Sequence, residues 1–279
     1  MVTRIYSFLK SRALSLLPDS VLQPLRVWHH RRVLGSFPDT DEPDLAVVRE
    51  LVQRGAVAVD LGANFGMYTK VLSDLVGPTG TVISVEPVRQ TFDALSRNIR
   101  SLGMNNVTCV NVAISDSDGD VVMELPKYDT GGINFYQATV VTSADTRMDS
   151  NQRVLVPALR LDTLVAGKGI VGFVKCDVEG HELACLSGAE VVLNSHGPAW
   201  LVEVSGDPDE SGTKAMHVFR TFQSLSYVSW WFDGHRLVKR RPGDRSTNYF
   251  FLKAAHVAKL RDTAPQLFGD KLTEARVTS

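Results

Sequence analysis

Cysteine and long apolar runs are both scarce in this sequence. Its 279 residues include only Cys109, Cys176 and Cys185, and their spacing fits neither a zinc site nor a disulfide framework. Sparse cysteine is typical of a reducing compartment, so we expect a cytoplasmic protein. The first 20 residues lack the long apolar segment of a secretion signal, and no stretch is apolar enough to span a bilayer.

The sequence also lacks an excess of charge of one sign. Lysine and arginine total 30 while aspartate and glutamate total 31, which gives a formal net charge of -1 at pH 7. Because no overall positive field attracts phosphate groups, we expect no nucleic-acid partner.

A local excess of basic residues occurs near the N-terminus. Residues 1–40 are predicted to form a helical extension, because apolar residues recur there at helical spacing up to a break at Pro18 and Pro24. Packing of these helices on the domain is the favoured interpretation. Peripheral contact with the inner face of a membrane is the alternative. The basic residues are Arg4, Lys10, Arg12, Arg26, Arg31 and Arg32.

Strand and helix patterns alternate from residue 41 to residue 115. Short β-rich apolar runs cover residues 56–60, 81–86 and 107–115, and amphipathic helical patterns begin after Pro43 and separate the runs. This alternation predicts an α/β fold with a doubly wound, mostly parallel sheet. Ligands bind such sheets at the carboxyl ends of the strands.

The alternation is interrupted from about residue 117 to residue 160. Strand-like segments at 119–125 and 153–161 flank a polar segment, which predicts an antiparallel β insertion that walls a substrate site. Strands at 172–177 and 199–205 then alternate with helices around 183–193 and 216–225. Two final strands, 227–232 and 248–252, are predicted to be joined by a hairpin-like turn at Asp233 and Gly234. We place the main domain at 41–255 and a C-terminal tail at 256–279.

A glycine-containing loop joins the first strand to the next helix at residues 60–69. Gly62 and Gly66 allow the backbone to turn tightly against a ligand, and Asn64 tolerates a left-handed conformation. Glu86 ends the following strand, where a carboxylate can accept both hydroxyl groups of a ribose. Together these residues predict a nucleoside site.

The type of nucleoside follows from what the loop lacks. The G-x-G-x-x-G spacing of dinucleotide-binding proteins is missing, and Asp60 precedes the loop. A carboxylate at this point would repel a pyrophosphate but attract the ammonium of a methionyl group. The sequence therefore favours S-adenosylmethionine over NAD, and a dehydrogenase is the last alternative.

Several segments in order resemble the motifs of the FkbM family of class I methyltransferases. They are residues 60–69, 86–87, 112–116, 161–164 and 175–182, and the resemblance covers about residues 57–252. It implies a Rossmann-like, seven-stranded sheet with the last strand antiparallel, so that residues 41–255 form the methyltransferase domain. It also implies transfer of a methyl group from S-adenosylmethionine to an oxygen, often on a sugar, glycolipid or polyketide.

The same resemblance assigns a cofactor site. Asp60 and Gly62 would hold the methionyl end and Glu86 the ribose. Ser115 and Asp116 would hold the adenine edge. The full set of expected cofactor-binding residues is Asp60, Gly62, Asn64, Gly66, Tyr68, Thr69, Glu86, Pro87, Ser115 and Asp116.

An acid-rich segment at the end of a later strand offers candidates for the base. A sugar hydroxyl is too weak an acid to ionise unaided at neutral pH, so one positioned base is expected. The ordered candidates are Asp177, Glu179 and His181. Glu179 and Glu182 could instead serve only to favour a helix N-terminus. No resident metal is predicted, and a divalent-ion pair of Asp177 and Glu203 is the less favoured alternative.

The expected acceptor is a small molecule, glycan or glycolipid, whose identity the sequence does not specify. The enzymatic alternative is a nucleic-acid methyltransferase, which the charge balance and the lack of a segment for gripping an exocyclic amine disfavour. A non-catalytic cofactor-binding module of the same fold is the alternative from another class.

Overall fold

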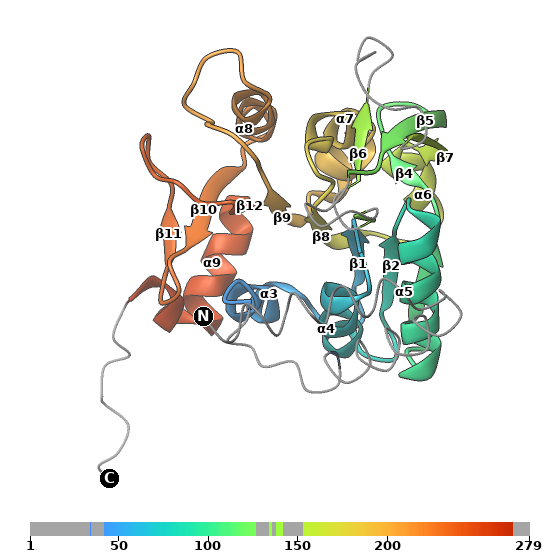
Figure 1. Ribbon diagram of the computed structural model, residues 1–279. Helices are drawn as coiled ribbons and strands as arrows, with labels where there is room; N and C mark the ends of the chain where they lie inside the picture. Colours follow the sequence, from blue (N-terminus) through green and yellow to red (C-terminus); the bar gives the residue numbers. More distant parts are fainter. Residues whose placement is uncertain (1–33, 35–41, 127–133, 136–137, 142–152, 270–279) are drawn as a thin grey trace, which may run out of the picture.

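The computed structural model describes residues 34, 42–126, 134–135, 138–141 and 153–269 (Figure 1). The predicted helices of the extension at 1–40 lie outside these ranges except for Leu34, which is buried. The expected membrane contact of that extension therefore falls on residues outside the described ranges. Among the helices that are described, none has the length and apolar character needed to cross a membrane.

A central sheet of eight strands runs in the order β11-β10-β12-β9-β8-β1-β2-β3. Neighbouring strands are parallel from β3 to β9, whereas β12 is antiparallel to both β9 and β10. The doubly wound, mostly parallel sheet is thus confirmed. The strands are β1 Val57–Leu61, β2 Thr81–Val85, β3 Val107–Val110, β8 Val171–Cys176, β9 Ala199–Glu203, β10 Val228–Phe232, β11 Leu237–Lys239 and β12 Asn248–Leu252.

The eighth strand, β11, corrects one detail of the prediction. The turn at Asp233 and Gly234 joins β10 to β11, which pair antiparallel, rather than joining β10 to the final strand. The Asp233 amide donates to the Arg236 carbonyl, and the Asp233 carboxylate accepts from the amides of His235 and Arg236. These bonds close a tight turn, so the chain folds back at once, and β12 arrives only after a second loop.

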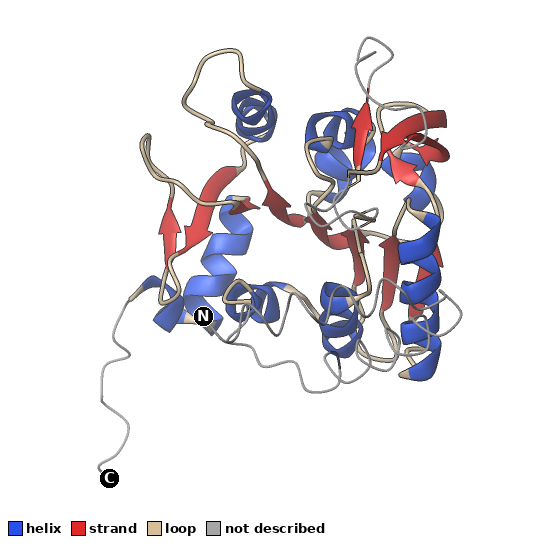
Figure 2. Ribbon diagram, viewed as in Figure 1, coloured by secondary structure: helices blue, strands red, loops and turns tan. Residues whose placement is uncertain are grey.

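Helices cover both faces of the central sheet (Figure 2). The alternation of side chains along β1 explains this, because Ala58 packs with one core cluster and Val59 with the other. One cluster includes residues of α3, α4 and α9 and the other includes residues of α6, α7 and α8. The helices are α3 Leu45–Leu51, α4 Met67–Val76, α5 Arg89–Ser101, α6 Leu161–Val165, α7 Glu182–Ser187, α8 Lys214–Ser224 and α9 Ala254–Thr263.

The predicted strand at 107–115 is two strands in different sheets. After β3 the Asn111 side chain donates to the carbonyls of Glu86 and Pro87, both at 2.8 Å, and the chain turns away from β2. The following strand, β4 Ala113–Ile114, pairs instead with β7 of a second sheet. The prediction of one continuous strand is therefore wrong, because Asn111 within the predicted run bonds to the loop after β2.

The predicted helix at 183–193 is also divided. It consists of α7 and a π-helical turn, η2 Val192–His196, separated near Gly188. A Cβ at Gly188 would lie 2.0 Å from the Ser115 carbonyl oxygen, so the backbone here packs directly against the segment after β4. This close approach explains why the helix does not continue.

The insertion forms the second sheet, with strand order β4-β7-β5-β6. Its remaining strands, β5 Gly119–Glu124, β6 Thr139–Val141 and β7 Arg153–Leu159, pair antiparallel as predicted. Met123, Ala138 and Val156 form a small core with Val88, which lies between β2 and α5. The insertion therefore packs beside the carboxyl end of the first two strands.

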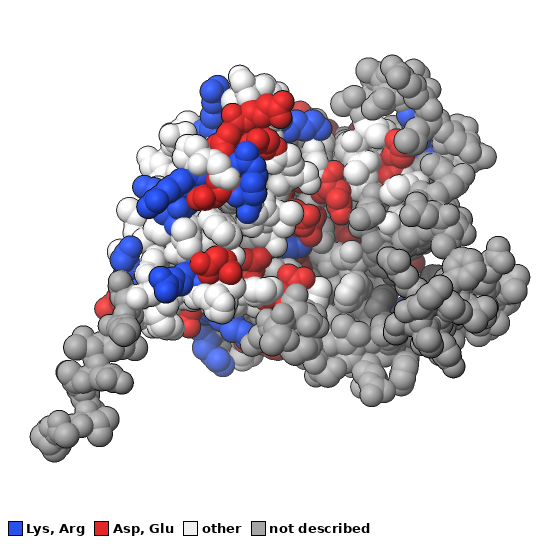
Figure 3. Space-filling view, turned by 60° about the vertical axis from the view of Figure 1, so that its left-hand side comes forward, with Lys and Arg blue, Asp and Glu red and all other residues white. Residues whose placement is uncertain are grey.

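The described part of the C-terminal segment packs on the domain. Leu260 of α9 is fully buried, and Leu267 of the short helix η3 Pro265–Phe268 is 6% exposed. On the surface, acidic and basic side chains are intermixed over the face drawn in Figure 3. Arg245 forms surface ion pairs with Asp207 and Asp209, at 2.6 and 2.9 Å.

Candidate functional site

The loop between β1 and α4 has the backbone that its residue types predict. Gly62, Asn64 and Gly66 all have positive φ, at 74°, 53° and 102°. A Cβ at Gly62 would lie 1.7 Å from the carbonyl oxygen of Asp177, so only glycine permits this contact between the loop and the end of β8. The close approach brings Gly62 beside Asp177, the first candidate for the base.

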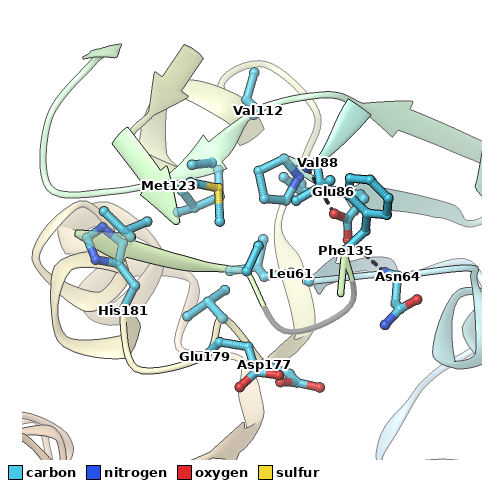
Figure 4. A pocket seen from close by; sticks show the side chains of 18 residues that line it. Leu61, Asn64, Glu86, Val88, Val112, Met123, Phe135, Asp177, Glu179 and His181 are labelled. Carbon is cyan, nitrogen blue, oxygen red and sulfur yellow. Dashed lines mark hydrogen bonds between the residues drawn. The ribbon is translucent and has the colours of Figure 1, made fainter. Parts of the chain in front are cut away.

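A pocket opens at the carboxyl ends of β1, β2 and β8 (Figure 4). It encloses about 650 Å³, including solvent at its mouth. The insertion supplies an apolar wall that contains Met123 and Phe135. The predicted site residues that line the pocket are Gly62, Asn64, Glu86, Pro87, Asp177, Glu179 and His181.

Glu86 is held in place by two backbone amides. Its Oε2 accepts from the Asn64 amide and its Oε1 from the Val88 amide, both at 3.0 Å (Figure 4). Burial raises the pKa of Glu86 to about 7, although the two amides oppose the shift. Each oxygen of a carboxylate has further acceptor capacity, so the fixed side chain can still receive two hydroxyl groups from a ligand.

Asp60 lies beneath the loop and is fully buried, outside the pocket lining. Its Oδ2 accepts from the Thr69 hydroxyl at 2.6 Å, and Thr69 also bonds to Ser84 at 2.9 Å. Its Oδ1 has no hydrogen-bond partner among the described residues. Burial raises the pKa of Asp60, and the charge of Lys175 opposes that shift. Asp60 and Thr69 therefore join β1 to α4 and support the loop from below.

Gly66 and Tyr68 also lie outside the lining. Gly66 ends the loop as the residue before α4. The ring of Tyr68 covers the Lys175 ammonium at 4.8 Å, and its hydroxyl donates to Glu42 at 3.4 Å. Gly66 and Tyr68 therefore support the loop and the end of β8 and do not form the wall of the cavity.

Asp177 and Glu203 meet at the ends of β8 and β9. Cys176 pairs with Val202 in the parallel register of β8 and β9, so Asp177 and Glu203 follow at the same edge of the sheet. Burial, followed by the charge of Asp177, raises the pKa of Glu203 to about 7. Glu179 stands beside them on the turn, with φ at 51°. Burial and the nearby Asp177 also raise the pKa of Glu179. The three acidic residues that the sequence analysis named at these strand ends thus lie at one edge of the sheet.

Lys175 is a member of this site that the sequence analysis missed. Its ammonium donates to Asp177 Oδ2 at 2.8 Å, and its side chain is 10% exposed. The two residues are separated by one position on an extended segment, which places both side chains on the same face. That spacing is the signal that could have identified the pair.

In the described ranges, no group of three or more histidine, cysteine, aspartate or glutamate side chains is arranged to hold a metal ion. Asp177 and Glu203 do lie together, but one oxygen of Asp177 already accepts from the Lys175 ammonium. The Lys175 ammonium therefore supplies the positive charge beside these carboxyl groups.

His181 lines the far side of the pocket from Glu86 (Figure 4). Its Nε2 is hydrogen-bonded to the Ser115 hydroxyl at 3.0 Å, and burial lowers the pKa of the imidazole. Ser115 and the exposed Asp116 do not line the cavity; the lining there is the apolar run Val112 to Ile114. Ser115 therefore orients His181 in this structure.

Glu182 has a local role at the start of α7. Its carboxylate accepts from the Gly180 amide at 2.8 Å, and the residue is buried. This bond stabilises the tight turn that carries Glu179, as the helix-terminus interpretation predicts for Glu182.

Comparison with known proteins agrees with these features. The curated relatives include the hexuronic acid methyltransferase AglP of Haloferax volcanii, which is 24% identical over 171 residues, or 61% of this chain and 62% of the relative. A protein-L-isoaspartate O-methyltransferase of Caenorhabditis elegans is 24% identical over 140 residues, or 50% of this chain and 61% of the relative. The chain thus matches about three fifths of the length of these relatives.

Solved methyltransferase structures are similar to this chain at lower sequence identity. A methyltransferase FkbM from Methylobacillus flagellatus is 16% identical, with a TM-score of 0.45 over 71% of this chain and 44% of that one. The pattern of the methyltransferase FkbM domain itself matches residues 60–229, which is more than half of the sequence. The chain therefore belongs to the FkbM methyltransferase family.

Proposed function

We propose that this protein transfers a methyl group from S-adenosylmethionine to a hydroxyl of a sugar, glycolipid or related small molecule. The observation that carries the proposal is that Glu86 and Asp177 line the same pocket. One carboxylate suits a ribose and the other suits the proton of an acceptor, and both stand at the carboxyl edge of a parallel sheet.

The residues of the pocket fit the nucleoside. Glu86 is fixed by two amides with acceptor capacity left for the ribose hydroxyls. Gly62 leaves space where a side chain would block the loop. Below the pocket lining, the buried Oδ1 of Asp60 is an acceptor without a partner among the described residues. The cofactor supplies an electrophilic methyl group attached to a positively charged sulfur. The apolar residues Val112, Met123 and Phe135 exclude water from the remaining wall.

Asp177 is the first candidate for the base. With the cofactor bound as methyl donor, Asp177 would accept the proton of the acceptor hydroxyl as its oxygen is methylated. The carboxylate lies against the glycine loop and lines the pocket, so it can also orient the acceptor. Glu179 and His181 are the alternative proton acceptors in the lining.

The test is methyl transfer from labelled S-adenosylmethionine to a panel of glycans and glycolipids by the purified protein. We expect label on oxygen, and Asp177→Asn should lower kcat by about 100- to 10,000-fold. Asp74→Asn is a matched control, because that exposed carboxylate pairs only with Lys70 on the surface of α4. Label found only on nitrogen or carbon rejects the proposal, as does cofactor binding without transfer to any acceptor in the panel.

A further inference from the structure

We propose that Glu179 is a specificity-determining residue whose carboxylate receives a second hydroxyl of the acceptor, beside the hydroxyl that is methylated. The inference rests on the proposed function and deepens it, because it names the acceptor as a neutral polyol. It is carried by a glutamate that is held in a left-handed backbone conformation at the wall of the pocket, with no bond to its carboxylate from any described residue.

Glu179 occupies a turn position that favours other residue types. The His181 amide donates to the Val178 carbonyl at 3.3 Å, and both residues between them have positive φ, 51° at Glu179 and 90° at Gly180. Positive φ at both central positions is typical of type I′ turns, where glycine, asparagine and aspartate are preferred. A glutamate in this conformation therefore destabilises the folded protein relative to a glycine.

Contacts with two other elements hold the turn in place. Directly before it, the Asp177 amide donates to the carbonyl of Leu61, the last residue of β1, at 3.0 Å. On its other side, Lys214 at the start of α8 donates from Nζ to the Gly180 carbonyl at 3.3 Å. These contacts impose the left-handed conformation on Glu179, so its side chain is presented at a fixed point of the pocket.

The carboxylate of Glu179 gains nothing from the turn. In the part of the chain that the structure describes, no hydrogen bond or ion pair joins it to another residue, and Glu179 is exposed at the pocket. The Lys175 ammonium, whose charge reaches Glu179, donates to Asp177 at 2.8 Å. Because no bond in the folded protein offsets the backbone strain, we assign this conformation to ligand binding.

The position of Asp177 indicates what Glu179 binds. Both residues line the same edge of the pocket, opposite Val112 (Figure 4). Carboxylate oxygens accept hydrogen bonds from hydroxyl groups, so Asp177 can receive the hydroxyl that is methylated and Glu179 an adjacent one. An acidic group of the acceptor would be repelled by both carboxylates. The expected acceptor is therefore a neutral sugar or another neutral polyol.

Urea unfolding measures the strain at Glu179 without cofactor or acceptor. Glu179→Gly relieves the left-handed strain, so we expect its unfolding midpoint to lie roughly 0.2–0.4 M above that of the wild-type protein. Ser226→Gly is the matched control, because Ser226 also has positive φ, 63°, and follows α8 outside the pocket lining. Its midpoint should rise as well. An equal or lower midpoint for Glu179→Gly overturns the proposal, since the glutamate would then carry no strain that ligand binding has to explain.

Kinetics with neutral glycosides and the corresponding uronic acids test the binding role. With the neutral glycoside that the wild-type protein methylates fastest, Glu179→Gly should raise the acceptor KM by about tenfold or more and lower kcat by less. Ser226→Gly should leave both constants within about twofold of wild type. The matching uronic acid should react with about tenfold lower kcat/KM in the wild-type protein, and Glu179→Gln should narrow that difference.

Three kinetic results overturn the proposal while leaving methyl transfer intact. The first is an acceptor KM for Glu179→Gly within about twofold of wild type. The second is a loss of about 100-fold or more in kcat at unchanged KM, which would make Glu179 the base. The third is a uronic acid that is methylated as efficiently as the neutral glycoside. A wild-type protein that methylates no acceptor in the panel instead rejects the proposed function, and the role of Glu179 with it.

Discussion

Glu86 has two roles at the site. It must be rigid to hold the β1–α4 loop, and it must be ionised to receive two ribose hydroxyls. Burial raises its pKa to about 7, so near neutral pH a large fraction of the free protein carries a proton on this carboxyl. Ligand binding should therefore be coupled to proton release.

We expect the affinity for S-adenosylhomocysteine to rise with pH. Below the pKa of Glu86, which is about 7, the carboxyl must lose its proton before binding, so the affinity should increase up to about tenfold per pH unit and then level off. Calorimetry at several pH values in buffers of different ionisation enthalpy measures both the affinity and the proton release. Glu86→Gln should abolish the rise, whereas Glu203→Gln should retain it. A pH-independent affinity of the wild-type protein would contradict the role of Glu86.

Gly62 tests the close contact between the loop and β8. Gly62→Ala places a Cβ 1.7 Å from the Asp177 carbonyl oxygen, so we expect a loss of about 2–4 kcal/mol in unfolding free energy and at least tenfold weaker cofactor binding. Gly103→Ala is the matched control, because Gly103 also has positive φ but no atom within 4 Å of its Cβ position. Urea unfolding compares the two variants. Equal losses would show that backbone strain, and not the contact, explains the glycine.

The residue types at the site were partly predictable. Gly62, Asn64 and Glu86 could be identified because left-handed backbone and a strand-end carboxylate leave local signals in a sequence. Lys175 was missed because a lone lysine in a strand usually points to solvent, and only its spacing from Asp177 indicates the pair. Its burial depends on Asp60 and Tyr68, which come from other elements.

Helices and strands with a strong apolar periodicity were predicted correctly. Where an element ends at a contact with a distant residue, the end was not predicted. The strands β1 and β2 and the helices α4 and α5 follow their apolar patterns. The division between β3 and β4 depends on Asn111 bonding to the loop after β2. The end of α7 depends on Gly188 packing against the Ser115 carbonyl. Neither contact is visible in a local pattern.

The helix α9 provides a prediction at the scale of an element. Leu260 is fully buried in the core cluster that includes α3 and α4, so Leu260→Ala should lower the unfolding free energy by about 2–5 kcal/mol. Lys259→Ala, on the exposed side of the same helix, should change it by less than about 0.5 kcal/mol. Chemical denaturation measures both. Similar stability of the two variants would mean that α9 adds little to the domain.

At the scale of the whole molecule, a hydrogen bond joins Asp44 to Asn248, which is 204 positions later in the sequence. The Asn248 Nδ2 donates to the Asp44 Oδ2 at 2.8 Å. Burial raises the pKa of Asp44 from 3.8 to about 6, although the bond from Asn248 opposes the shift. The folded protein therefore binds this proton more tightly than the unfolded chain does. The resulting stabilisation is complete below about pH 4 and is lost as the pH rises through 6.

Asp44→Asn should remove this loss while keeping an acceptor for Asn248. We expect a gain of about 1–2 kcal/mol in unfolding free energy at pH 7, which becomes smaller as the pH is lowered to about 5. Urea unfolding at each pH measures the difference, with the exposed Asp262→Asn as the control. A gain that does not change with pH would assign the effect to packing rather than to charge.

The position of β12 between β9 and β10 has a consequence for synthesis on the ribosome. The hairpin of β10 and β11 leaves the exit tunnel first, yet the edge of β9 has no partner until Asn248–Leu252 emerges. A nascent chain that stalls before residue 248 already contains the entire nucleoside loop but presents an unpaired apolar strand. We expect such a chain to be recognised by chaperones and proteases until β12 pairs with β9.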